Sequence, residues 1–210
     1  MDGTIIDSTE AVIKNWQRRS IDVLQIYEPK LANWEYSISN DMLINDKDIC
    51  HAEGLIPKEF GQDAVEIPGS RVMLEKLEQQ VVPWAIVTSG TQPLVSGWLD
   101  VMQLAHPKNL VTAEDVDNGK PDPACYRLGA KKLGLQMQQP LIIVFEDAPA
   151  GVRSGKAAGY TVVALNTTHT LDQLVEAGAD YIVQDMRSVS LKSWNPTTGE
   201  GELEIANALV

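Results

Sequence analysis

Cysteine is scarce in this sequence, with only Cys50 and Cys125 among 210 residues. Their distant positions match no metal-binding or redox spacing, and a disulfide framework needs more of them, so we expect two reduced thiols. Long apolar runs are also lacking, since stretches such as residues 141–145 are far shorter than a membrane-spanning helix. No charged and then apolar leader opens the chain. These absences predict a cytoplasmic protein without a membrane anchor.

Basic residues are outnumbered, because 17 lysines and arginines face 29 aspartates and glutamates, for a formal net charge of −12. This charge would repel nucleic acid phosphates and anionic membrane surfaces, and no basic cluster offsets it. The three histidines, His51, His106 and His169, form no pairing with a nucleophile. We therefore expect neither nucleic acid nor membrane as a partner, and an anionic small substrate would need local cations or a metal ion. No pattern indicates an oligomeric state.

The chain does contain an alternation of strand and helix patterns after about residue 68. Apolar residues make up 44% of the sequence, enough to fill the core of one large domain. Short β-branched runs between helical patterns are typical of βαβ units, so we predict an α/β fold with a Rossmann-like, doubly wound parallel sheet. The strand candidates are residues 84–88, 141–145, 160–165 and 181–183. The helix candidates are residues 72–80, 93–102, 123–133, 149–158 and 171–177.

The opening third of the chain lacks this alternation. Asp7 and Glu10 suit a capping box, and apolar residues over 12–27 recur at roughly helical spacing. We therefore predict a helical cap inserted at residues 9–66, uninterrupted by a strand and irregular over residues 36–51, which are polar and lack periodicity.

The core would then consist of residues 1–8 and 67–187. Proline and glycine at 68–69 mark the return of the chain from the insert to the core. The tail, residues 188–210, has two short alternating stretches on either side of residues 196–199, a pattern consistent with a terminal hairpin.

Two of the apolar runs lead into reactive or polar groups. In an open α/β sheet, ligands gather beyond the carboxyl ends of the strands. Thr88-Ser89-Gly90 follows one run and offers hydroxyls and backbone N–H groups just before a helix, a good arrangement for phosphate oxygens. The alternative is an ordinary strand-to-helix turn with a hydroxyl cap.

Adjacent carboxylates, Glu146 and Asp147, stand where the run 141–145 ends. Hard Mg²⁺ prefers a few carboxylate oxygens together with water and substrate phosphate, which such a pair can supply. Alternatively, Asp147 caps the helix that Pro149 begins. Lys120, held before Pro121, presents a point charge suited to phosphate, although a loop lysine is more often only solvated.

Asp2-Gly3-Thr4 alone is a turn tripeptide, with glycine for unusual dihedral angles and aspartate for local hydrogen bonds. Together with the groups above it forms a set, each member in a loop or after an apparent strand, in one order along the chain. This set resembles the haloacid dehalogenase superfamily, specifically its phosphatases with a helical cap after the first motif. Residues 54–69, 84–91, 119–123 and 144–151 also resemble the fungal glycerol phosphate phosphatases and 2-deoxyglucose-6-phosphate phosphatases.

The resemblance implies a role for each motif residue. Asp2 would be the general acid and base, with its backbone carbonyl on Mg²⁺, and Glu146 and Asp147 would complete the protein's metal ligands. Thr88 would bond the phosphoryl group through its hydroxyl, assisted by the backbone N–H groups of Ser89 and Gly90. Lys120 would neutralise charge in the transition state.

The chain departs from the family pattern at its start. The family's nucleophile is an aspartate two residues ahead of the Asp-Gly-Thr turn, at the end of a central apolar strand, and no residue precedes Met1 to supply it. We therefore expect the first core strand to be missing and turnover of this chain to be impaired. In the cap, Arg18-Arg19-Ser20 resembles a family segment but follows the first predicted helix sooner than the family pattern leads us to expect.

Three functions remain open at this point. The first is a Mg²⁺-dependent phosphomonoesterase for small phosphorylated polyols or sugars, working through an aspartyl phosphate. The second is a pseudoenzyme that binds phosphate, metal or a protein partner without turnover. The third is a sugar phosphate mutase on the same fold.

Overall fold

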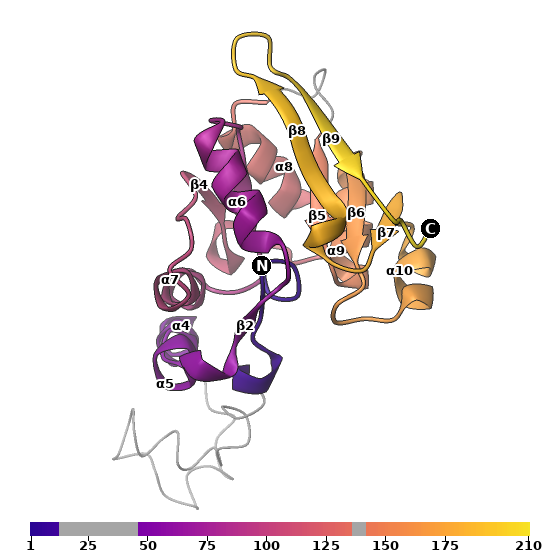
Figure 1. Ribbon diagram of the computed structural model, residues 1–210. Helices are drawn as coiled ribbons and strands as arrows, with labels where there is room; N and C mark the ends of the chain where they lie inside the picture. Colours follow the sequence, from indigo (N-terminus) through magenta and orange to yellow (C-terminus); the bar gives the residue numbers. More distant parts are fainter. Residues whose placement is uncertain (13–45, 136–141) are drawn as a thin grey trace, which may run out of the picture.

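The computed structural model describes residues 1–12, 46–135 and 142–210, which form parallel sheets flanked by helices (Figure 1). Strand β3 (Ala85–Val87) pairs in parallel with β4 (Asn109–Val111). A second block contains β5 (Ile143–Glu146), β6 (Thr161–Leu165) and β7 (Tyr181–Val183), parallel and in that order. The predicted α/β fold with parallel strands is confirmed.

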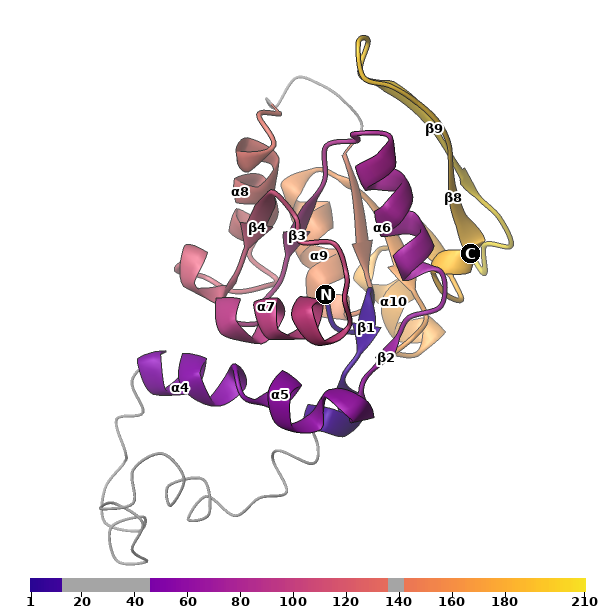
Figure 2. The same ribbon diagram turned by 60° about the vertical axis from the view of Figure 1, so that its left-hand side comes forward.

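Five helices accompany these strands: α6 (Ser70–Gln79), α7 (Gln92–Val101), α8 (Ala124–Lys132), α9 (Pro149–Ala158) and α10 (Leu171–Ala177). Their bounds agree with the predicted ranges to within two residues at either end. Helix α8 packs on β3 and β4, while α9 packs on β5 and β6. Figures 1 and 2 show α6 on the opposite side of the sheets from α8 and α9, so the strands are covered on both faces.

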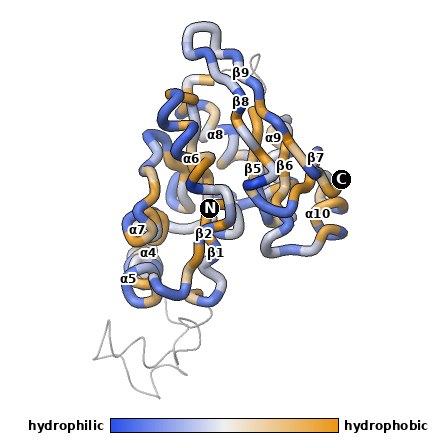
Figure 3. Tube along the Cα trace, in the orientation of Figure 1, coloured by the Kyte–Doolittle hydropathy of each residue, from blue (hydrophilic) through white to orange (hydrophobic). Residues whose placement is uncertain are grey.

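Alternation along the strands explains this layering. Val144, Val162 and Ala164 belong to the apolar cluster that includes Val152 of α9. Their neighbours on the other face, Val163 and Leu165, belong instead to a cluster with Met73 of α6. Because successive strand residues point to opposite faces, strands apolar at every position serve two layers at once. Figure 3 shows this hydrophobic continuity along β5 to β7.

The tail forms an antiparallel hairpin of β8 (Val189–Asn195) and β9 (Glu200–Ile205), preceded by the short helix η3 (Met186–Ser188). Strand β8 contacts α6, and the two elements lie on the same side of the sheets (Figure 1). Val189 and Leu191 are buried in the apolar cluster with Leu165, so the hairpin is packed onto the core.

Two short strands join the ends of the insert. Strand β1 (Ile6–Asp7) pairs antiparallel with β2 (Val65–Glu66), so the chain leaves and re-enters the core side by side. Between them the structure describes helical residues 9–12, α4 (Asp46–Glu53), α5 (Ile56–Phe60) and the 3-10 helix η1 (Gly61–Asp63).

The insert differs from the prediction in two places. Strand β2 interrupts a segment that was expected to hold no strand, because pairing with β1 extends two residues that local pattern does not mark. Residues 46–51, expected to be irregular, belong to α4, which contacts α7; tertiary packing, which has no trace in local periodicity, supports this helix. The predictions for residues 13–45, including the helical spacing after Val12 and Arg18-Arg19-Ser20, lie outside the described residues.

The two parallel blocks are separate in the described part of the chain, because β3 and β5 share no ladder of hydrogen bonds. Between them lies a cavity of ≈ 890 Å³. Its walls come from β3, β5, α6, α8 and the hairpin, and its apolar lining includes Ile86, Phe145, Trp194 and Leu203. Met1 and Ile5 also line this space. Adjacent strands of a closed sheet leave no such room, so the sheet is divided at this point.

Strand β4 was not predicted. It spans three residues after Pro107, and so short a run gives no alternation to detect. The predicted strand at 141–145 is observed from Ile143 to Glu146, while Leu141 lies outside the described residues. Across residues 1–12, 46–135 and 142–210, every helix is too short or too polar to cross a bilayer.

Candidate active site

The loop after β3 lies at the carboxyl end of the strand. The backbone N–H of Thr88 continues the pairing with β4 by donating to the carbonyl oxygen of Val111, at 2.9 Å. Its hydroxyl oxygen accepts a hydrogen bond from the N–H of Gly90, at 3.1 Å, which folds the loop back on the threonine. Ser89 is exposed. The hydrogen bond to Val111 therefore fixes the beginning of a loop that presents polar groups. Helix α7 begins two residues after Gly90.

Glu146 ends β5 and is buried among hydrogen-bond donors. One carboxylate oxygen accepts from the Tyr126 hydroxyl, at 2.6 Å, and from the Lys120 ammonium. The other accepts from the backbone N–H groups of Asp147 and Ala148, at 3.0 and 3.1 Å. Burial alone would raise the pKa of Glu146, but the Lys120 charge and these hydrogen bonds outweigh it and lower the pKa to about 2. Glu146 is therefore ionised and paired.

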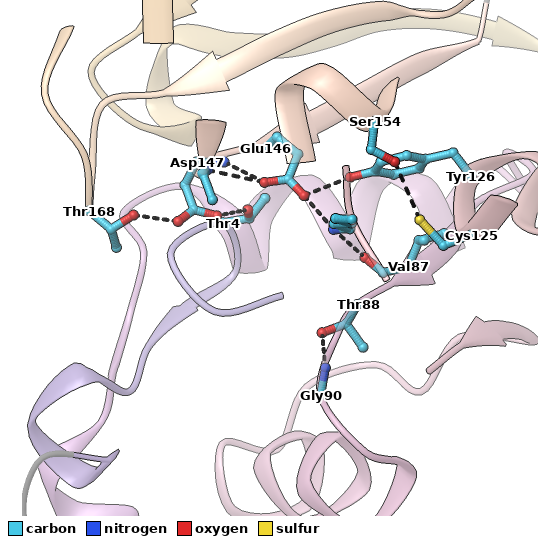
Figure 4. Close-up of polar contacts among 12 residues, drawn as sticks. Thr4, Val87, Thr88, Gly90, Cys125, Tyr126, Glu146, Asp147, Ser154 and Thr168 are labelled. Atoms are coloured by element: carbon cyan, nitrogen blue, oxygen red, sulfur yellow. Dashed lines mark hydrogen bonds and ion pairs between the residues drawn. The ribbon is translucent and has the colours of Figure 1, made fainter. Parts of the chain in front are cut away.

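Lys120 connects the ends of the two parallel blocks. Its side chain is 11% exposed, and its ammonium contacts both Glu146 at the end of β5 and the carbonyl oxygen of Val87 at the end of β3, the latter at 3.4 Å. The ammonium also lies 4.9 Å from the centre of the Tyr126 ring, within cation–π range. One cation thus joins the two strand ends. Figure 4 shows Glu146 and Val87, its two partners, with Thr88 next to Val87.

Asp2-Gly3-Thr4 forms a turn packed on Asp147. The carboxylate of Asp2 accepts from the backbone N–H groups of Ser8, at 2.8 Å, and of Gly3. Gly3 has a positive φ of 69°, and a Cβ there would lie 2.0 Å from an Asp147 carboxylate oxygen. Thr4 donates its hydroxyl to Asp147 at 3.0 Å, so only glycine lets this turn approach the carboxylate so closely.

Asp147 is a buried carboxylate close to other charges. Burial raises its pKa, and the neighbouring charge of Glu146 raises it further, against the opposing effect of hydrogen bonds from Thr168 and Thr4. The amino group of Met1 is close to the same charges: burial and then the Lys120 ammonium lower its pKa, while Glu146, Asp147 and Asp2 act to raise it. The rim of the sheet therefore gathers both signs of charge in a small, poorly solvated volume.

The predicted residues come together from four separate stretches of chain. Lys120 bridges the end of β3, just before Thr88, to Glu146, while the Asp2 turn rests against Asp147. Tyr126 and Thr168, which complete the hydrogen bonding of the two acidic residues, were not predicted. Tyr126 occupies an ordinary helical position and Thr168 an exposed loop, so nothing local distinguishes either one.

A metal ion suits part of this donor set. No group of three or more His, Cys, Asp or Glu side chains with metal-binding geometry occurs among the described residues. Asp147 and the adjoining Asp2 turn offer hard oxygen donors of the kind that a divalent cation prefers, and water or substrate oxygens would fill its other positions. Burial raises the pKa of Asp147, and a bound cation would favour its ionised form. Glu146 differs, because both of its oxygens already accept from protein donors.

Gly151, in the first turn of α9, lies directly against Glu146. A Cβ at this position would be 2.0 Å from Glu146 Oε1, whereas a Cβ at Gly119 would meet nothing within 4 Å. Gly151→Ala should therefore lower the free energy of unfolding by about 1–3 kcal/mol through overpacking, although alanine favours a helix over glycine. The matched Gly119→Ala should change it by less than about 0.5 kcal/mol. Urea unfolding compares the two, and equal stabilities would contradict this account of the Glu146 pocket.

Comparison with known proteins agrees with this geometry. The sequence model of the haloacid dehalogenase-like hydrolase family matches residues 1–165 of this chain. The chain is 33% identical to glycerol-1-phosphate phosphohydrolase 1 of Saccharomyces cerevisiae, across 97% of this chain and 87% of that protein. It is 34% identical to 2-deoxyglucose-6-phosphate phosphatase 1 of the same yeast, across 91% and 87%.

A solved structure gives the same result for the fold. The crystal structure of a hydrolase from Pseudomonas syringae has a TM-score of 0.64 and 25% identity, with 88% of this chain and 91% of that one covered. The resemblance proposed from the motifs, including that to the two groups of yeast phosphatases, is confirmed. The chain belongs to the haloacid dehalogenase-like hydrolase family.

Proposed function

We propose that this site hydrolyses phosphomonoesters of small polyols or sugars with the help of Mg²⁺. The observation that carries the proposal is the Lys120 ammonium, on a side chain only 11% exposed, which joins the ends of β3 and β5 beside the Thr88 loop. A fixed cation next to hydroxyl and backbone N–H donors suits a phosphoryl group, whose transfer depends on positioning and electrostatic stabilisation. The names of the yeast relatives, which specify glycerol phosphate and a sugar phosphate, support this substrate class.

Each residue has a role in the proposed reaction. The Thr88 hydroxyl and the backbone N–H groups of Ser89 and Gly90 hold the phosphoryl oxygens, and Lys120 neutralises their charge. Asp2 gives its proton to the leaving alkoxide as the ester P–O bond breaks, and then takes a proton from the attacking water. Asp147 and the Asp2 carbonyl would hold Mg²⁺, with Glu146 beside them. The metal would supply charge neutralisation at the phosphoryl oxygens.

The nucleophile needs a separate proposal, because no described carboxylate beside Lys120 is free for it. Glu146 is held by four donors, and Asp147 lies against Gly3. We propose that an apolar strand filling the cavity between β3 and β5 carries the nucleophilic aspartate at its carboxyl end, two positions before Asp2. Its oxygen would bond to phosphorus as the ester bond breaks, and water would then release phosphate and restore the carboxylate.

A second candidate is phosphate binding without turnover. The set of carboxylates described at the rim favours it, because within those stretches no third acidic side chain with metal-binding geometry joins Asp2 and Asp147. The Lys120 and Thr88 groups would still bind an anion in that case.

Asp2→Ala tests the phosphatase proposal. In the phosphatase, release of inorganic phosphate from a panel of phosphorylated polyols and sugars requires Mg²⁺, stops on chelation, and falls by about 10²–10⁴-fold in this variant, because general acid–base catalysis is lost. Asp7→Ala, on the neighbouring strand, is the control and should retain activity. Binding of inorganic phosphate by nuclear magnetic resonance with no turnover of any ester would instead favour the second candidate.

A further inference from the structure

Helix α7, which follows the phosphate loop, lacks capping groups of its own. Its N-cap residue Thr91 makes no side-chain capping bond, no acidic residue lies in its first turn, and Pro93 has no N–H to donate. The first amide groups of a helix have no partner within it, so those of Thr91 and Gln92 need acceptors from elsewhere. Both acceptors are carboxylates from other segments.

Glu53, the last residue of α4 in the cap insert, supplies one of them. Its Oε2 accepts from the backbone N–H of Thr91 at 3.2 Å and from the Thr91 hydroxyl at 2.7 Å. Thr91 is 6% exposed and Glu53 is half-buried, so these bonds form out of bulk water. A carboxylate at the positive end of a ten-residue helix is also favoured by the helix dipole.

Glu114, in the 3-10 helix η2 (Ala113–Asp115), supplies the other. It accepts from the backbone N–H of Gln92 at 3.0 Å and from the Cys50 thiol at 3.3 Å. Cys50 and Glu53 are three residues apart on α4, and so share one face of that helix. Helix α4 is therefore attached to the start of α7 directly through Glu53 and indirectly through Glu114.

Close packing along α7 supports these polar contacts. A Cβ at Gly54 would lie 2.8 Å from Pro93, one at Gly97 would lie 2.9 Å from Pro57, and one at Gly61 would lie 2.6 Å from Val101. The three contacts follow α7 from its first turn to its last, and Figure 2 shows α4 and α5 lying along it. This close packing of α4 and α5 on α7 places the Glu53 carboxylate against the first turn of α7.

We propose that Glu53 is a positioning residue for the phosphate loop, acting through Thr91. Thr91 directly follows Gly90, whose carbonyl oxygen accepts from the N–H of Ala113 at 3.1 Å. With Glu53 holding the next residue, the loop is fixed from both sides, and the N–H groups of Ser89 and Gly90 keep one direction. The role in the reaction rests on the proposed function, whereas the attachment of α4 to α7 does not.

Glu53→Ala and Glu53→Gln form the test, in the full chain. Amide hydrogen exchange should accelerate about tenfold or more at Thr91 and over residues 50–54 in the alanine variant, because a hydrogen bond to a charged acceptor is lost. Glutamine keeps an acceptor oxygen and should restore most of the protection. Exchange over β6, far from the contact, is the internal control and should not change.

Kinetics give the second readout. If Glu53 positions the loop, the alanine variant raises the KM for a small phosphorylated polyol about tenfold while kcat changes less, and glutamine rescues it. Unchanged exchange at Thr91 in Glu53→Ala, or equal acceleration in both variants, would overturn the proposal. If no phosphatase activity is found but exchange still responds, the proposed function fails while the attachment of α4 stands. A full exchange response with unchanged KM in an active enzyme would overturn the role in loop positioning.

Discussion

Lys120→Met should abolish measurable phosphate release and also lower the free energy of unfolding by about 3–5 kcal/mol, the usual cost of removing one partner of a buried ion pair. The side chains of Lys120 and Glu146 are 11% and 6% exposed, so the carboxylate left behind cannot be solvated. Methionine keeps the length and most of the volume of lysine, which leaves the lost charge as the main change. The loss of a preorganised cation alone should cost about 10²–10³-fold in rate.

The double variant Lys120→Met with Glu146→Gln separates the two effects. Glutamine removes the uncompensated charge, so most of the lost stability should return, whereas phosphate release should remain absent. Urea unfolding and phosphate release are measured on both variants, with chelator present in the unfolding series so that metal binding does not contribute. A single variant as stable as the parent protein would show that the ion pair has no structural role.

Adding an apolar strand ahead of Met1, with aspartate as its last residue, should have the largest effect on activity. The strand would enter the ≈ 890 Å³ cavity and pair with both β3 and β5, because among the described residues each has an unpaired edge there. Burial of about five apolar side chains, at about 1.5–3 kcal/mol each before the cost of ordering the segment, should raise stability by several kcal/mol. Turnover should rise from the impaired rate of the present chain to that of an ordinary phosphatase, about 1–10³ s⁻¹.

A matched extension ending in asparagine distinguishes structure from chemistry. It should give the same rise in thermal midpoint as the aspartate extension but no more phosphate release than the present chain, since asparagine is a poor nucleophile toward phosphorus. A strand of equal length with alternate residues changed to serine should give neither effect. Equal and robust release from the present chain and the extended one would contradict our account of the nucleophile.

The sequence predicts the core because its strands are buried on both faces and end at polar residues. Glu146 and Thr88 could be placed at one rim on this basis alone, since parallel strands align their carboxyl ends. Strand β4 and helix α4 were not predicted, because the structure of each depends on a partner. Strand β4 depends on its register with β3, and α4 depends on its contact with α7. Local pattern carries no information about either partner.

The site shows the same division. Asp2, Lys120 and Asp147 stand out by chemical type and position, but their partners do not. Tyr126 bonds to Glu146 from a helix 20 residues earlier, and Glu53 reaches Thr91 from 38 residues away. Such contacts require the folded chain, because the tyrosine and the glutamate are unremarkable in their own segments. The pairing of Glu146 with Lys120 likewise follows only from the meeting of the Lys120 loop with the end of β5.

The terminal hairpin has a consequence for how the protein tolerates shortening. Trp194 and Leu203 lie far along the chain from every residue in the proposed chemistry, yet they form part of the cavity wall. A chain that ended after residue 187 would keep all of the proposed site residues but would lose the hairpin side of the cavity wall. The apolar surface exposed in this way would promote aggregation of the newly made chains. Residues 188–210 thus enclose the apolar space beside the site without taking part in the proposed reaction.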